Sequence, residues 1–157
     1  MGLETLASGV QDEITQAVSQ ANATLKDLAE VQYRLGQVGN PGAQNALVDQ
    51  RDRLLDRLGS LVQIDVTMDD RNLATVRLGA DGGGPILASG GTHARMTGDA
   101  AGKLTVIPAD PDAPTISRMA VGGVLGGLSQ AAGTIGQATD DLDGWATLIA
   151  SQVNAAH

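Results

Sequence analysis

The stretch that decides the fold is Asn45-Ala46-Leu47-Val48-Asp49-Gln50-Arg51-Asp52-Arg53-Leu54-Leu55-Asp56-Arg57-Leu58-Gly59-Ser60-Leu61-Val62. Successive residues of an α-helix are rotated by about 100°, and at that angle the leucines fall on one broad side and the aspartates on the other. Asn40 followed by Pro41 supplies a helix start, as Asn accepts at the N-cap and Pro suits the first turn. We therefore predict an amphipathic helix over residues 43–62.

Arg51 departs from this pattern, because it projects toward the apolar side of the helix. A buried guanidinium needs an acceptor, since an unpaired buried charge is very costly. We predict that Arg51 ties this helix to another segment through a carboxylate or backbone carbonyls. The aspartates Asp49, Asp52 and Asp56 lie near cationic neighbours, so they are interpreted as a solvated charged face and not as a metal site.

Two further helices are predicted by apolar residues that recur at helical period. Over residues 6–35 the repeat is Ile14, Ala21, Leu28 and Leu35, and over about 128–156 it is Leu128, Ile135, Leu142, Ile149 and Ala156. The breakers Gly36, Gly39, Asn40, Pro41 and Gly42 separate the first helix from the second, which predicts a helical hairpin.

Residues 63–119 change in texture, because short β-branched segments alternate with Gly, Asp, Asn and Pro. Strands are predicted at 64–67, 73–78, 85–87, 104–107 and 115–117, forming one small antiparallel sheet. The predicted fold is therefore α+β: an elongated three-helix antiparallel bundle carrying a β-rich insertion. The helical bundle would comprise 1–62 and 124–157, and the insertion 63–123.

Composition excludes several classes of function. The net charge is −8 with only 10 Lys and Arg, which argues against nucleic acid and anionic membranes as partners. No apolar run approaches the length of a membrane span, and the N-terminus lacks the pattern of a secretory signal. Cysteine is absent, and neither His93, in an expected loop, nor His157 has the i, i+4 partner of a helical zinc site. We expect no cofactor, no metal and no catalytic residue.

Two glycine runs are candidates for phosphate-binding loops. Residues 79–84 lack a P-loop Lys and lead into a strand, so a hairpin turn is predicted there. The run Gly122-Gly123-Val124-Leu125-Gly126-Gly127 precedes a helix but lies outside a βαβ unit. Gly122, Gly123, Gly126 and Gly127 are therefore predicted to let the backbone re-enter the bundle and to let helices approach closely.

The stretch 45–62, and above all Asp49, Gln50, Arg51, Asp52, Leu54 and Leu55, resembles a helix of the flagellar hook-associated protein 1 family. The resemblance covers about residue 8 to the end and includes the strand start at Gln63-Ile64-Asp65-Val66, the 122–128 glycine motif and the terminal Val153-Asn154-Ala155-Ala156-His157. One departure is Ser129-Gln130, where the family commonly shows an acidic residue paired with Arg.

This resemblance implies a structural subunit and not an enzyme. Family members are exported through the flagellar type III apparatus without a cleavable signal and form an extracellular ring between hook and filament. The implied partners are the hook protein, the distal hook–filament junction protein and further copies of the full-length chain. We interpret the 157 residues as a core fragment without the terminal axial helices, monomeric in solution. Open alternatives are another flagellar axial protein, such as the distal junction protein or a flagellin-like protein, and a small-ligand-binding or enzyme domain that uses the β insertion.

Overall fold

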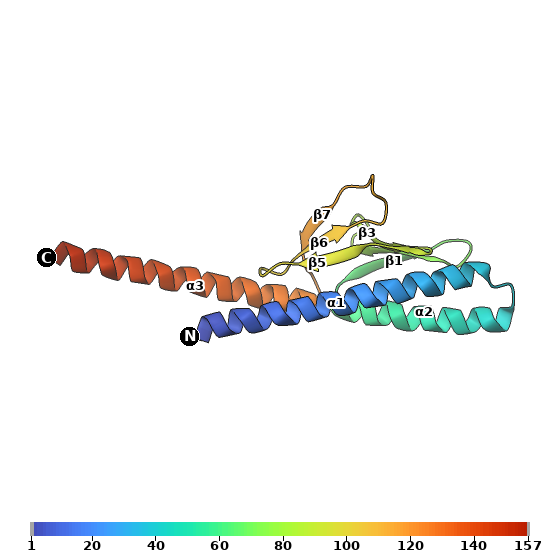
Figure 1. The fold of residues 1–157 in the computed structure, drawn as a ribbon, viewed down its shortest axis with the longest axis horizontal. Helices are drawn as coiled ribbons and strands as arrows, with labels where there is room; N and C mark the ends of the chain where they lie inside the picture. The colour runs from blue at the N-terminus through green and yellow to red at the C-terminus, as the bar shows by residue number, and fades with distance from the viewer. Residues whose placement is uncertain (1, 157) are drawn as a thin grey trace.

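The computed structural model describes residues 2–156, and three long helices dominate it (Figure 1). Helix α1 spans Gly2–Gln37, α2 spans Pro41–Leu61 and α3 spans Gly123–Ala156. Asn40 is the N-cap of α2, and its side chain accepts a hydrogen bond from the backbone N–H of Gly42 at 2.9 Å. The predicted start of the second helix is thus confirmed, because the Asn side chain satisfies a donor that has no partner within the helix.

The α+β class is also confirmed, and the structure shows how the three helices are arranged (Figure 1). Helix α2 folds back along the C-terminal part of α1, while α3 runs antiparallel to α1 along its N-terminal part and continues beyond it. Helices α2 and α3 meet where α2 ends, so most of the rod is two helices thick. This arrangement has a local cause. After the second sheet, the chain returns to the helices directly beside the last turn of α2, so α3 begins where α2 ends.

The strands form two antiparallel sheets and not the single sheet that we predicted. The first has the order β1-β2-β3-β4, from β1 (Ile64–Met68), β2 (Ala74–Leu78), β3 (Ile86–Ser89) and β4 (Thr92–His93). The second has the order β5-β6-β7, from β5 (Arg95–Gly98), β6 (Lys103–Ile107) and β7 (Ile116–Met119). Strands β4 and β5 were missed, because both are short and neither shows a clear alternation of apolar residues.

The chain passes from the first sheet to the second at Ala94, which is buried between β4 and β5. Its backbone N–H donates to the carbonyl of Leu87 at 2.7 Å. The switch therefore keeps its backbone hydrogen-bonded although it belongs to neither ladder.

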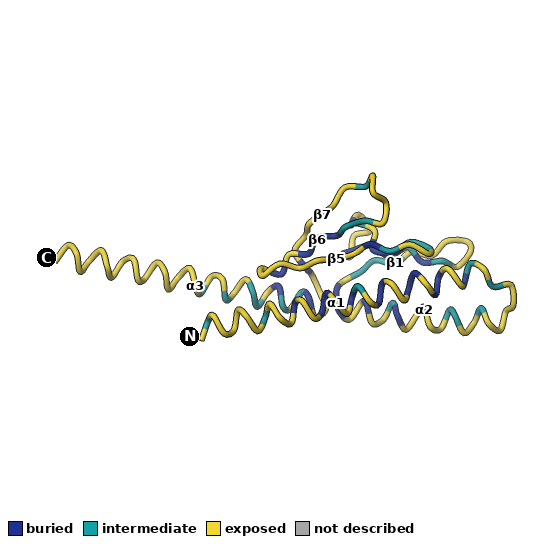
Figure 2. Tube along the Cα trace, viewed as in Figure 1, coloured by how far each residue is buried: buried dark blue, intermediate teal, exposed yellow. Residues whose placement is uncertain are grey.

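One continuous core joins the helices to both sheets (Figure 2). Ile14, Leu25 and Leu28 of α1 are almost fully buried together with inward-facing residues of the strands. The strand residues of this cluster are Ala74, Val76, Leu78, Leu87, Ala88, Met96, Leu104 and Val106. Both sheets pack on the same side of α1 (Figure 1), so one helix carries the apolar face of each of them.

Candidate assembly surfaces and the contacts that position them

Arg51 makes the contact that its position on the helix wheel predicted. The residue is 4% exposed, and Nη1 donates to the backbone carbonyl of Asn72 at 2.6 Å. Nε and Nη2 donate to Oδ1 of Asp52 at 3.0 and 2.8 Å. Asn72 lies in the turn between β1 and β2, where it adopts a left-handed φ of 62°. The guanidinium thereby fixes α2 to the first sheet, which confirms the predicted tie.

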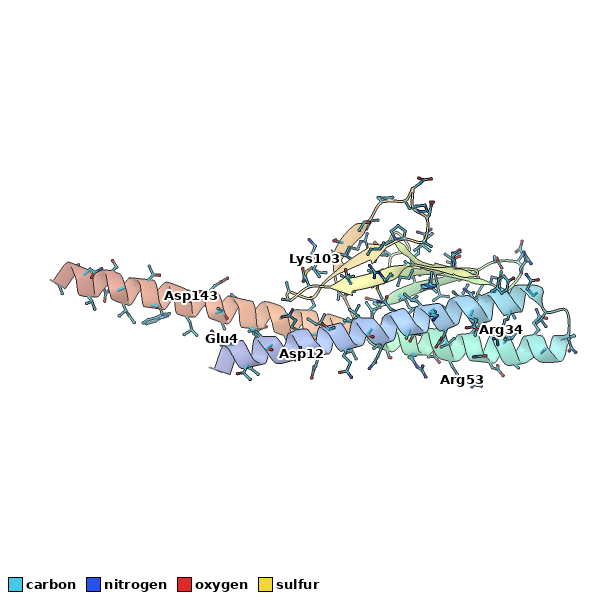
Figure 3. All side chains as sticks on the ribbon, viewed as in Figure 1. Glu4, Asp12, Arg34, Arg53, Lys103 and Asp143 are labelled. Carbon is cyan, nitrogen blue, oxygen red and sulfur yellow. The ribbon has the colours of Figure 1, made fainter. Side chains whose placement is uncertain are left out.

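The rest of the α2 motif divides between core and solvent and forms no single site. Leu54 is buried and Leu55 packs partly against the core, whereas Asp49 and Gln50 are exposed. Figure 3 shows Arg53 on the side of α2 that faces away from the sheets. Among residues 2–156, no group of three or more His, Asp or Glu side chains is placed to hold a metal ion.

The re-entry motif needs its glycines at three of four positions. Gly122 and Gly123 have φ values of 68° and 61°, a region that side chains rarely adopt. A Cβ on Gly123 would lie 2.6 Å from the carbonyl carbon of Leu61, and one on Gly126 would lie 2.9 Å from the carbonyl carbon of Val121. Gly127 has nothing within 4 Å, so the predicted close approach is wrong at that position.

Two amides on α1, the half-buried Asn22 and the buried Gln32, hold the sheets to the helix, and the sequence analysis missed both. Asn22 bonds both backbone groups of Met96 in β5, donating to the carbonyl and accepting from the N–H, each at 2.8 Å. Gln32, 1% exposed, donates to the carbonyl of Gly90 at 3.0 Å and accepts from the N–H of Ala74. Their position on α1 could have indicated these roles. A polar side chain on the side of a helix that faces the core needs a hydrogen-bond partner.

Asn22 also protects an edge of the second sheet. Strand β5 is the first strand of the order β5-β6-β7, so its outer backbone groups face away from the ladder. An open strand edge is a template for pairing with another chain. The amide of Asn22 occupies the edge at Met96, which leaves that position unable to accept a further strand.

The glycine turn 79–84 joins β2 to β3, as predicted for a hairpin. A Cβ on Gly84 would lie 1.7 Å from the carbonyl oxygen of Leu78, so a side chain cannot be accommodated there. A largely apolar cavity of about 270 Å³ lies between the two sheets, with residues of β3, β4 and β6 in its wall. His93 lines it from strand β4, not from the expected loop, and Nδ1 of His93 bonds the carbonyl of Ala94 at 3.0 Å.

Five exposed large apolar residues lie on the C-terminal half of α3 and are called here the α3 stripe: Leu142, Trp145, Leu148, Ile149 and Val153, which are between 51% and 65% exposed. Figure 2 shows that this part of α3 lies beyond α1 and is exposed throughout. A row of large apolar side chains on one helix is typical of a surface that another protein segment covers.

Comparison with known protein families identifies the family to which this chain belongs. The model of the family described as flagellar hook-associated protein FlgK helical domain matches residues 1–157. The chain belongs to this FlgK family. The match favours the hook-associated protein over the other flagellar axial proteins that the sequence left open.

A solved structure shares the fold of this FlgK-family chain. The flagellar hook junction protein FlgK from Burkholderia pseudomallei superposes with a TM-score of 0.66 at 21% identity, over 83% of this chain. The 157 residues span 25% of the length of that FlgK chain. No match was found among curated protein sequences.

The described residues contain no helix with the length and apolar character needed to span a membrane. His157, the last residue of the motif that resembled the family, lies outside the described residues, whereas Val153 and Asn154 belong to α3.

Proposed function

We propose that this chain is the helical domain of a structural subunit that joins the flagellar hook to the filament. The observation that carries the proposal is the family match over the whole chain, found on an elongated rod. Helix α1, with 36 residues, is about 54 Å long at 1.5 Å per residue. A rod of this length offers extended sides to neighbouring subunits, and contacts that are weak singly add together in a repeating assembly.

The firm attachment of both sheets to the helices is suited to a subunit that transmits force. Arg51, Asn22 and Gln32 attach different points of the two sheets to the helices, in addition to the shared apolar core. A sheet that is held by several buried or partly buried hydrogen bonds cannot shift without leaving polar groups unpaired. The helices and sheets would therefore move together, and neighbouring subunits would meet a surface of constant shape.

The implied partners are the hook protein, the distal hook–filament junction protein and further copies of the full-length chain in a ring. The helices would face the filament axis and make the side-to-side contacts, with the sheets turned outward. The subunit would act outside the cell after export through the flagellar type III apparatus without a cleavable signal. It would use packing alone, without catalysis or a cofactor, and the isolated 157 residues would be monomeric.

The test is a pull-down of the full-length protein against purified hook protein and distal junction protein. The expected result is binding to both. A charge reversal on the outer face of α2, Arg53→Glu, should weaken binding, because this side chain is exposed on the side away from the sheets. The matched control is Lys103→Glu on the second sheet, also exposed, which should bind like the unmodified protein. Failure to bind either partner would refute the junction role, and equal loss in both variants would refute the orientation.

A further inference from the structure

The hairpin turn between β2 and β3 contains a chemically reactive pair of residues that the junction role does not use. Asp81 and Gly82 are both exposed, and they lie in the middle of the turn 79–84. The side-chain carboxyl carbon of an aspartate that precedes glycine is open to attack by the next backbone nitrogen, because glycine has no Cβ to hinder the approach. The turn is therefore a candidate site of covalent change in the backbone.

Two features of the folded turn favour this attack. Within residues 2–156 the N–H of Gly82 donates to no acceptor of the chain, so no internal hydrogen bond has to break before its nitrogen moves. The N–H of Gly83 donates to Oδ1 of Asp81 at 3.2 Å. This donor contacts an oxygen on which negative charge develops when the carboxyl carbon is attacked, so it stabilises the transition state. Nucleophile, electrophile and charge-stabilising donor thus come from three consecutive residues.

We propose that Asp81 isomerises to isoaspartate in the folded protein. The nitrogen of Gly82 bonds to Cγ of the protonated Asp81 carboxyl group, and the amide proton leaves with the carboxyl hydroxyl as water, which gives a cyclic imide. Water then adds to the former backbone carbonyl of Asp81, and the ring opens so that the chain runs through Cγ. No oxidant, reductant or cofactor is consumed, and the mass of the protein does not change. The proposal goes beyond the junction role and does not depend on it.

The isomerisation adds one methylene to the backbone of a turn that has no spare room. A Cβ on Gly84 would already lie 1.7 Å from the carbonyl oxygen of Leu78. The N–H of Leu78 donates to the carbonyl of Pro85 at 3.0 Å, and this bond closes the turn. An extra backbone atom between these two residues is expected to weaken the bond. The β2–β3 hairpin would therefore be looser in aged molecules.

Two other aspartates separate the requirements of the reaction. Asp99 lies in an exposed turn and its Oδ1 likewise accepts from an N–H two residues on, that of Ala101 at 2.9 Å, but the Cβ of Ala100 hinders the attack. Asp143 is followed by Gly144, but both lie within α3, on the part that extends beyond α1 (Figure 3). Ring closure requires a backbone dihedral that an α-helix does not allow, so the helix must first open locally.

The test incubates the full-length protein for several weeks at neutral pH and physiological temperature and then digests it with trypsin. Cleavage after Arg and Lys places Asp81 in peptide 78–95 and Asp99 in peptide 96–103, and each of these peptides contains one Asp and no Asn. Methylation by an isoaspartyl methyltransferase measures the yield. Electron-transfer fragmentation locates the isoaspartate, including any at Asp143 in the peptide that begins at Met119. Synthetic copies of the peptides give the rate without the fold.

The expected result is isoaspartate at Asp81, with at least about tenfold less at Asp143, where the helix must open first. Asp99 should form little, and Ala100→Gly should raise its isoaspartate severalfold, because the variant removes the hindering Cβ. The Leu78 amide should exchange its hydrogen faster in the aged fraction than in fresh protein.

Two outcomes would overturn the proposed isomerisation. One is a yield at Asp81 no higher than at Asp99 and Asp143. The other is a rate at Asp81 at least about tenfold slower in the folded protein than in the synthetic peptide, because the fold would then protect the turn. Unchanged exchange at the Leu78 amide in the isomerised fraction would refute the loosening of the hairpin.

Discussion

Gln32 offers the sharpest test of how the sheets are attached. The variant Gln32→Met keeps nearly the same volume and helix propensity but removes both hydrogen bonds. It leaves the carbonyl of Gly90 and the N–H of Ala74 without their present partner. Each orphaned buried group costs roughly 1–3 kcal/mol, so the loss is about 2–6 kcal/mol. Burying the apolar Met side chain offsets roughly 1–2 kcal/mol of this.

The expected net loss of unfolding free energy is therefore up to about 5 kcal/mol and centred near 2.5 kcal/mol, and for a chain of this size each kcal/mol lowers the midpoint of thermal unfolding by roughly 2–4 °C. Urea unfolding followed by circular dichroism measures it. The control is Gln16→Met, on the exposed side of the same helix, where a change within about 0.5 kcal/mol is expected. If the two variants lose the same free energy, Gln32 does not hold the sheet and the reasoning is wrong.

Three further variants probe the remaining contacts. Arg51→Met should lower the free energy of unfolding by about 1.5–3 kcal/mol, since a charged hydrogen bond to the Asn72 carbonyl is lost, and Arg53→Met on the exposed face should not. Gly123→Ala should destabilise by more than about 2 kcal/mol in thermal unfolding, since the backbone is left-handed and a Cβ meets the end of α2, whereas Gly127→Ala should stabilise by up to about 1 kcal/mol. Asn22→Leu should accelerate hydrogen exchange at the Met96 amide, whose acceptor is the Asn22 side chain.

Each of these variants has an outcome that would count against the structure. Arg51→Met and Arg53→Met with equal stability would place the Arg51 guanidinium in solvent. A stable Gly123→Ala variant would mean that the re-entry turn is not left-handed. Unchanged exchange at the Met96 amide would mean that the edge of β5 is protected by something other than Asn22.

Local patterns in the sequence were sufficient for the helices. Three local features predict the helices: the seven-residue repeat, the breakers at 36–42 and the N-cap at Asn40. Each acts within a few turns of chain, so it can be recognised without tertiary structure. Arg51 belongs to the same group, because a charged residue on an apolar helix face implies a partner even when the partner is unknown. Its acceptor, the carbonyl of Asn72, could not be named, since backbone carbonyls carry no sequence signal.

The division into two sheets needed tertiary structure. Strands β4 and β5 are too short to show a period, and their pairing depends on the switch at Ala94. The roles of Asn22 and Gln32 likewise depend on which strand groups reach the helix. Gln32 and Asn22 bond backbone groups that are 58 and 74 residues away along the chain. No local sequence pattern predicts such a contact.

The sequence by itself determined the three helices, the β-rich region between them and the family resemblance, because periodicity and breakers are properties of neighbouring residues. Only the tertiary structure decided that α2 and α3 follow one another along α1, and hence which part of α3 stays uncovered. The physical reason is that a covered and an uncovered apolar stripe have the same composition. Whether a leucine is in the core or on the surface depends on what lies beside it, and that is a matter of geometry.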